Sequence, residues 1–406
     1  MEPIVYLDSC DFSDLSEVDE KISDENRETL STLRSSARKG RARFVLSGIH
    51  LAEAVHATET PAHKEAAVRR AGLMQELCAN NFMRLPHEIM SLEIAKAING
   101  AADAKLSNEE LFSKENEWFG ISIPIDFSQK RSDANASLDR LMSHLPRRER
   151  RRFKSDLSLH KARGREKWRE FARNDTSPLS DEFPFNQFTG KFVTEWISGH
   201  ITDEEYSNRL YEALNNPKGL VESVLDFSDQ RQTIYGLLRN QGRDMQLRMD
   251  ENLQEMIDNL AELATPELDF DFSKFFRQAL QKVGFQRTIV SAYSISKIDS
   301  YTDKEIAQFV TACPAVSTFL NMYIAYSRSR YESTWQRIKS GKRTPTTRKA
   351  SDLGDMMHAV YAPYSNLFRC DAHFSSILKE DQNVRSRIVS RRGLNALANP
   401  IEGQGI

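Results

Sequence analysis

Apolar residues near the start of the chain come in short runs that alternate with segments of helical spacing. Pro3–Leu7 (PIVYL) and Arg43–Leu46 (RFVL) are typical of buried strands, because they are short and rich in β-branched or aromatic residues. Between them, Glu25–Lys39 carries leucines three residues apart and predicts a helix that stops at Gly40. The same pattern predicts further helices at Ile49–Thr58, Lys64–Ala79 and Ser91–Ala102, and a short strand at Phe82–Leu85. This alternation predicts a parallel α/β layer for residues 1–102.

The pattern changes between residues 103 and 345, where polar segments carry apolar residues three and four positions apart. Gly219–Thr265 and Asp303–Arg337 show this spacing most clearly, and the whole segment predicts a helical array. Met322–Trp335 is rich in aromatic residues, which are suited to base stacking, but its helical spacing favours packing in a core.

The α/β pattern returns after a loop at residues 340–347. A helix is predicted at Asp352–Tyr361, a strand at Asn366–Arg369, a helix at Ala372–Lys379 and a last strand at Arg385–Val389. We therefore expect residues 1–102 and 346–399 to form one core, split by a large, mostly α-helical insertion at 103–345.

Composition narrows the functional classes only slightly. Charged residues make up 28% and aromatic residues 9% of the 406 residues, which indicates a folded protein. The net charge of -2 does not point to nucleic acid, so any such binding must rest on local patches. The four cysteines form no CxxC pair and predict reduced thiols rather than a zinc site or a disulfide scaffold. Neither a membrane span nor a signal peptide is predicted, and we expect a cytoplasmic location.

Acidic residues follow the predicted strands at corresponding places. Asp8 ends the first strand, and Asp371 comes directly after the Asn366–Arg369 strand. Because parallel strands end at the same edge of a sheet, we expect these two carboxylates to lie close together. Glu53 lies on the helix after the second strand, and Asp355 lies in the first turn of a later helix, with Asp352 three residues before it on the same face.

This concentration of carboxylates predicts a cation site. Several negative charges in one crevice are unstable without cations. Oxygen ligands favour Mg²⁺ or Mn²⁺ over zinc. Such an ion lowers the pKa of a bound water and so generates a nucleophile that can attack a phosphodiester.

The segments VYLDSC, LSGIHLAEA, DMMHAVY and LFRCDAHF together resemble the PIN-like domain nuclease family, and HAVYAPYSNLF resembles a bacterial subset of it. The resemblance covers residues 1–100 and 350–395 and implies a three-layer α/β/α sandwich with a parallel sheet. It also implies metal-dependent cleavage of RNA, less often of DNA. Carried over to this chain, the catalytic, metal-binding acids would be Asp8, Glu53, Asp355 and Asp371, with Asp352 as an additional metal ligand. The chain departs from the family in its long central segment and in having Ser9-Cys10 after the first acid.

Each acid taken alone has a simpler explanation. Asp8 and Asp371 could cap the following helices, while Glu53 and Asp355 could be ordinary helix residues. Asp11 or Ser13 is expected to cap the helix after the first strand, and Asp14 is also interpreted as a capping residue.

Two acid-x-x-His pairs raise the alternative of a di-iron site. Glu53 is followed by His56, and Asp355 by His358. Both pairs lie in segments flanked by strands rather than on long bundle helices, which disfavours this alternative. We expect His358 to orient a carboxylate rather than to bind a metal.

Two basic runs are candidates for substrate binding. One contains Arg147, Arg148, Arg151 and Arg152; the other contains Lys342, Arg343, Arg348 and Lys349 and directly precedes the acids near residue 352. Either could equally be a solvated helix or a surface loop. As contacts they would hold the phosphate backbone and read no bases.

The sequence thus predicts a metal-dependent endoribonuclease that hydrolyses single-stranded RNA with metal-activated water, with RNA a more probable substrate than DNA. A protein partner or a second copy of the chain could bind through the helical insertion. The alternative is a PIN-like scaffold with weak or no catalysis. A toxin, a defence protein and an RNA-processing enzyme all fit these residues.

Overall fold

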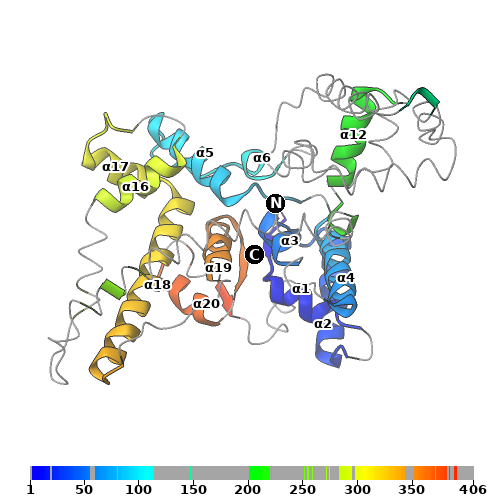
Figure 1. Cartoon of the computed structure of the whole chain (residues 1–406), viewed down its shortest axis with the longest axis horizontal. Coiled ribbons are helices and arrows are strands. Elements are labelled where there is room, and N and C mark those ends of the chain that lie inside the picture. The colour runs from blue at the N-terminus through cyan, green and yellow to red at the C-terminus, as the bar shows by residue number, and fades with distance from the viewer. Residues whose placement is uncertain are drawn as a thin grey trace.

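The structure is a computed structural model of the chain. It describes residues 2–18, 21–54, 60–79, 81–113, 146–148, 201–214, 216–219, 221, 251, 254–255, 258, 271, 274, 283–294, 298–342, 352–370, 372–381, 384 and 388–390. Helices surround a small sheet, as Figure 1 shows.

The sheet has four parallel strands that come from both ends of the chain. They are β1 (Ile4–Tyr6), β2 (Arg43–Val45), β3 (Leu367–Cys370) and β4 (Ile388–Ser390). Their order is β2-β1-β3-β4, and Val5 of β1 pairs with Leu367 of β3. The predicted parallel α/β fold is thereby confirmed, and the first strand of the chain lies beside a strand from near its end.

Alternate residues of the strands point into two hydrophobic clusters, one on each face of the sheet. Tyr6 and Phe368 belong to one cluster, and Val5 and Phe44 belong to the other. The Val5 face is covered by α1 (Ser9–Leu15), α2 (Asp24–Arg38) and α4 (Pro61–Cys78). The hydrophobic cluster on the Tyr6 face continues into α5 (Pro86–Ile98), α16 (Val283–Tyr293), α17 (Asp303–Ala312) and α18 (Pro314–Lys339). Figure 1 shows α1, α2 and α4 on one side of the strands and α18 on the other.

Shorter helices complete the described part of the chain. They are α3 (Gly48–Ala54), α6 (Asn108–Leu111), α12 (Asp203–Leu214), α19 (Asp352–Ala359), the 3-10 turn η1 (Ala362–Tyr364) and α20 (Ala372–Leu378). The predicted strand at Phe82–Leu85 is reduced to isolated bridges from Phe82 to Leu46 and from Met83 to Phe112.

The helical segment predicted at Asp303–Arg337 consists of two helices that bend by 101°. Pro314 begins α18, and because proline has no N–H to donate, it starts a new helix more easily than it continues one. Within the described residues no single helix is long and apolar enough to cross a membrane; only α17 and α18 taken together reach that length and composition.

Part of the predicted insertion belongs to the hydrophobic core on one face of the sheet. Phe319 and Tyr326 of α18 share a hydrophobic cluster with Tyr6 of β1. Met322 and Trp335 are also buried, which confirms core packing for the aromatic segment. The insertion boundaries stay a prediction, and most of the helical segment predicted at Gly219–Thr265 lies outside the described residues.

Candidate functional site

Asp8 links the first strand to the first helix. Its carboxylate accepts a hydrogen bond from the Cys10 amide at 3.4 Å, while its own amide donates to the Asp11 carboxylate at 3.0 Å. The Asp8 side chain in turn accepts from the backbone of Asp11, and these reciprocal Asp8–Asp11 bonds form a capping box, so Asp8 is the N-cap of α1. The expectation that Asp11 or Ser13 caps this helix was wrong, because α1 begins almost immediately after β1 and places Asp8 at the cap.

Asp11 instead forms a buried ion pair with a strand residue that the sequence analysis did not single out. Arg369 of β3 donates to the two Asp11 oxygens at 3.0 and 2.6 Å, and both side chains are 1% exposed. Arg369 also donates to the Ser390 carbonyl of β4 at 2.6 Å. These contacts fix the start of α1, and with it Asp8, against the strands from the end of the chain.

Glu53 of α3 and His358 of α19 form a second link between the two ends of the chain. The Glu53 carboxylate lies 3.2 Å from His358 Nε2, which confirms the expectation that His358 orients a carboxylate. Gly354, one turn before His358, makes room for this contact. A Cβ atom at Gly354 would lie 2.8 Å from Glu53 Oε1.

Three of the predicted acids act electrostatically on His358. Burial alone would lower the pKa of His358, but the charges of Glu53, Asp8 and Asp355 raise it above its ordinary value. Burial likewise raises the pKa of Glu53, yet the charge of His358 outweighs it and brings that pKa down to about 2. An ionised Glu53 beside a protonated His358 is therefore the stable pairing.

The pKa of Asp8 shifts upward, opposite to that of Glu53. Burial, followed by the nearby charge of Asp11, raises the pKa of Asp8 to about 6. Negative charge thus accumulates at the carboxyl edge of the sheet, and the described side chains neutralise it incompletely at Asp8.

A chain of buried hydrogen bonds continues behind His358. Its Nδ1 lies 2.5 Å from Tyr6 Oη, Tyr6 Oη lies 2.9 Å from Ser47 Oγ, and Ser47 Oγ lies 2.9 Å from His50 Nδ1. His50 Nε2 donates to the Leu7 carbonyl at 2.9 Å. Burial, assisted by the charge of His358, lowers the pKa of His50 to about 3, so His50 is neutral. The chain therefore holds His358 in one orientation.

Arg70 of α4 is a site residue that the sequence analysis passed over. Burial lowers its pKa, and the charges of Cys10 and Glu53 oppose that shift, which places the guanidinium beside the acids. Its Nε is buried and has no hydrogen-bond partner among the described residues. The two adjacent arginines of the VRRAG segment are the sequence feature from which Arg70 could have been predicted as a site residue.

The other predicted metal ligands are less fully placed. Asp352 is the first residue of α19, but its side chain lies outside the described part, as does all of Asp371. Among the residues that the structure describes, no three His, Cys, Asp or Glu side chains are grouped so that they could hold a metal ion.

The predicted basic runs are only partly described. Arg147, Arg148 and Lys342 are exposed. Arg151, Arg152, Arg343, Arg348 and Lys349 lie outside the described residues. Their role in substrate binding stays a prediction.

The described geometry brings Glu53 into contact with His358, and Asp8 and Asp355 lie near enough to act on His358 electrostatically, while Asp352 and Asp371 stay untested. Comparison of the chain with protein-family models, curated proteins and solved structures finds no match.

Proposed function

We propose that the chain is a divalent-metal-dependent ribonuclease of PIN-like fold that hydrolyses phosphodiester bonds of single-stranded RNA in the cytoplasm. The proposal is supported by the contact between Glu53 and His358 and by the charges of Asp8 and Asp355 acting on the same histidine, beside the carboxyl end of β1 in a parallel sheet. Carboxylates from separate elements gathered at this edge are typical of a catalytic crevice.

The donor set fits Mg²⁺ or Mn²⁺. Asp8 and Asp355 are half-buried carboxylates, and oxygen ligands of this kind suit hard divalent cations. Burial and the charge of Asp11 raise the pKa of Asp8, and a bound cation would lower it again by favouring the ionised carboxylate. Asp8, Asp355 and Asp371 would hold the ion, with Glu53 and Asp352 close to it.

A bound ion would supply a water of lowered pKa as the attacking group. The chain's own residues supply the remainder. Arg70 would hold a phosphate oxygen of the substrate, since a guanidinium matches phosphate geometry. His358 fixes the position of Glu53. With a pKa of about 6, Asp8 is mostly ionised at pH 7 and available as a ligand.

Cleavage of end-labelled single-stranded RNA and DNA with Mn²⁺ tests the proposal. We expect Asp8→Asn and Asp371→Asn to lose at least about 100-fold in rate, since even residues that only support metal ligands contribute roughly 10- to 100-fold. Asp299→Asn removes an exposed carboxylate and should cleave like the wild type. Equal rates in all four proteins would refute the site assignment.

A scaffold protein with weak or no catalysis is a second candidate. The Glu53–His358 pair favours it, because Glu53 already has a counter-charge without any metal. This candidate predicts no cleavage under any condition and no rise in melting temperature on adding Mn²⁺. A bound ion, in contrast, stabilises the fold by about 2.7 kcal/mol at roughly 100 times its Kd.

A further inference from the structure

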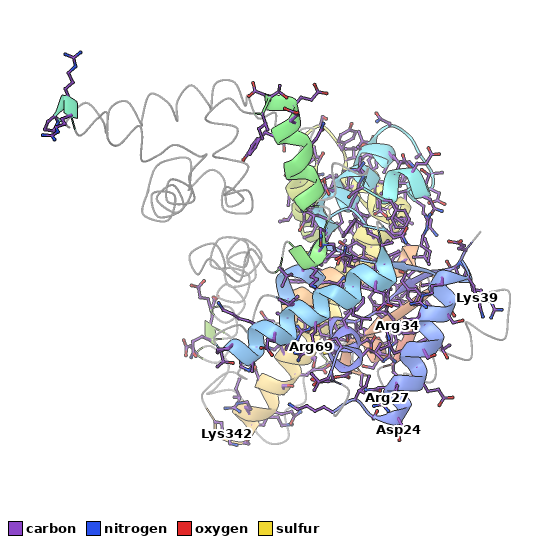
Figure 2. The ribbon with its side chains drawn as sticks, turned by 90° about the vertical axis from the view of Figure 1, so that its right-hand side faces the viewer. Asp24, Arg27, Arg34, Lys39, Arg69 and Lys342 are labelled. Carbon is purple, nitrogen blue, oxygen red and sulfur yellow. The ribbon has the colours of Figure 1, made fainter. Side chains whose placement is uncertain are left out.

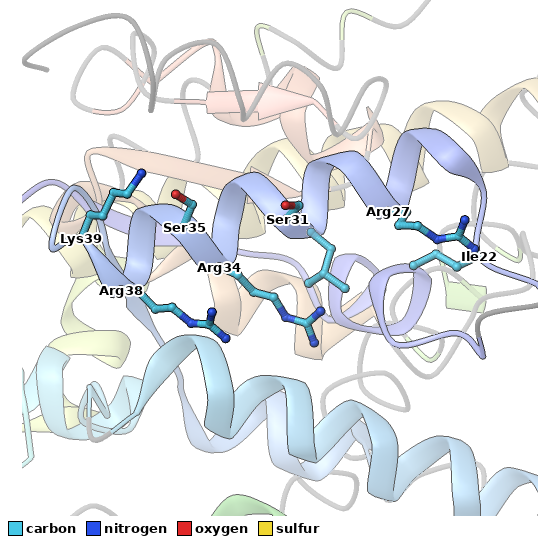
Figure 3. A pocket seen from close by; sticks show the side chains of 8 residues that line it. Ile22, Arg27, Ser31, Arg34, Ser35, Arg38 and Lys39 are labelled. Carbon is cyan, nitrogen blue, oxygen red and sulfur yellow. The ribbon is translucent and has the colours of Figure 1, made fainter.

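A basic groove is lined mainly by residues of α2, and Figure 3 shows Arg34 and Arg38 pointing from this helix toward α4. Its volume is about 460 Å³, and we refer to it as the α2 groove. The cations that line it are Arg27, Arg34, Arg38 and Lys39, and the remaining lining residues are Ile22, Leu30, Ser31 and Ser35. Most of these residues recur three or four positions apart, which places them on one side of the helix.

The α2 groove carries an excess of positive charge. Arg27 pairs with Asp24 at 3.4 Å, and Glu76 of α4 lies 2.7 Å from Arg34 and 3.6 Å from Arg38. In these ion pairs of the described residues, the four groove cations have two carboxylates beside them. The side chains of Arg27 and Arg38 are 55% and 76% exposed, so a ligand can reach them from solvent. This charge is local, because the whole chain has a net charge of -2.

Helix α4 connects the groove with the candidate site. Arg70 lies beside Glu53 at the acids, and its neighbour Arg69 donates to the Ser16 carbonyl at the end of α1 at 3.3 Å. The first turn of α2 lies beside the end of α1, because Asn26 Nδ2 donates to the Asp14 carbonyl at 3.4 Å. Figure 2 shows Arg69 on α4 and Arg27 and Arg34 along the neighbouring α2. Arginines therefore follow one another from the acids to the groove.

The dimensions and chemistry of the groove suit a nucleic-acid strand. Arg27 and Arg38 are eleven residues apart on one helix, or about 16 Å, which is the length of about five stacked nucleotides at roughly 3.4 Å each. The serine hydroxyls between them offer further hydrogen bonds to phosphate oxygens. An acidic protein would also be attracted to these arginines. The row of arginines that leads from the groove to the acids favours the RNA substrate as the ligand.

We infer that the α2 groove binds the sugar-phosphate backbone of the RNA strand whose scissile bond lies among Asp8, Glu53 and Asp355. This inference rests on the proposed function and adds the path of the substrate beyond the reacting bond. Because every contact is to backbone, the groove should bind RNA of any sequence.

Binding of fluorescently labelled single-stranded RNA to the full chain in EDTA tests the inference, because EDTA prevents metal-dependent cleavage. The triple variant Arg27→Gln, Arg34→Gln, Arg38→Gln should raise Kd at least about tenfold. It should also reduce the slope of log K against log salt by about 2, at roughly 0.7 per lost phosphate contact. The control replaces three exposed lysines elsewhere by glutamine, Lys274, Lys304 and Lys379, and should change Kd less than twofold.

A second variant tests whether weaker RNA binding comes from the changed charge of the groove rather than from unfolding. Ser31→Glu with Ser35→Glu adds negative charge to the α2 groove while leaving the Arg34–Glu76 pair in place. It should weaken RNA binding to a similar degree and keep the melting temperature of the wild type.

The possible outcomes distinguish failure of the groove inference from failure of the proposed nuclease function. Wild-type affinity in both variants, or a wild type that binds no RNA, overturns the inference. Displacement of RNA by poly-glutamate at equal charge concentration would assign the groove to an acidic protein and overturn it as well. Impaired RNA binding in the variants, together with a wild type that never cleaves RNA, would support the groove and refute the nuclease.

Discussion

Glu93 shows how a single buried carboxylate can join three parts of the chain. It lies on α5 with 0% exposure and accepts hydrogen bonds from the Ala315 and Val316 amides at 2.9 and 3.1 Å. The Tyr364 hydroxyl also donates to it. These amides begin α18, whose N-cap residue makes no side-chain capping bond, so Glu93 caps that helix from another element.

The titration of Glu93 makes stability depend on pH. Burial raises its pKa to about 7, from 4.5 in the unfolded chain. Between these values the folded protein holds a proton that the unfolded chain lacks. The stabilisation is therefore complete below pH 4.5 and is lost as the pH rises through 7. We expect Glu93 to contribute a fall of about 2 kcal/mol in the free energy of unfolding between roughly pH 5.5 and 8.

Urea denaturation at several pH values measures this effect by difference. Glu93→Gln, which cannot titrate, should show a smaller decrease in unfolding free energy over the same range. Parallel curves for the variant and the wild type would mean that Glu93 does not titrate as described.

At the residue scale, sequence reasoning found residues that share an edge of the sheet and missed those defined by distant partners. Asp8, Glu53 and Asp355 were found because each follows a recognisable strand or opens a helix. Glu93 looks like an ordinary helix residue, and its partners at Ala315 and Val316 lie more than 200 positions away in sequence. Local patterns contain no information about such contacts.

At the scale of elements, the Asp11–Arg369 pair ties α1 to β3. Removing one partner leaves an unpaired buried charge, so Asp11→Asn or Arg369→Met alone should cost about 3–5 kcal/mol of unfolding free energy. The double variant should be more stable than the sum of the two losses predicts, because no charge is left without its partner.

A surface pair provides the matched control. Asp24→Asn breaks the exposed pair with Arg27 and should cost at most about 1 kcal/mol. Losses at Asp11 and Asp24 of equal size in urea denaturation would contradict the assigned role of the buried pair.

The boundaries of elements were predictable wherever the chain carries its own stop or start signal. Gly40 has a φ of 63° and ends the α2 region as expected, because glycine adopts this backbone conformation without strain. Pro314 separates α17 from α18 for an equally local reason. The bridges at Phe82 were harder to predict, since they depend on which neighbours the chain meets in space.

At the scale of the whole molecule, β3 and β4 complete a sheet that the N-terminal strands begin. Val5 and Tyr6 are both 0% exposed, and β3 covers one edge of their strand. A chain ending at residue 345 would lose β3, β4 and the helices α19 and α20. We expect it to give no cooperative thermal transition by near-ultraviolet circular dichroism, and Mn²⁺ should not restore one. A transition within a few degrees of the full chain would show that the two parts fold separately.

The split core itself could be predicted, because strand-like runs occur only at the two ends of the chain. The packing of α16–α18 into the core on the Tyr6 face could not. Helical spacing in Asp303–Arg337 indicates that one side is buried but does not identify the surface that buries it.

The pairing of β1 with β3 also determines when during synthesis the sheet can form. The Ile4 amide donates to the side chain of Asn366, 362 residues later, so this part of the sheet cannot close until the ribosome has made β3. At about 5–20 residues per second, the first strand waits roughly 20–70 s for its neighbour. During that interval an apolar edge stands open, and Asp8 lacks the strand that holds its helix in place. The newly made N-terminal part therefore needs protection from aggregation, and the start of α1 is fixed only after β3 has been synthesised.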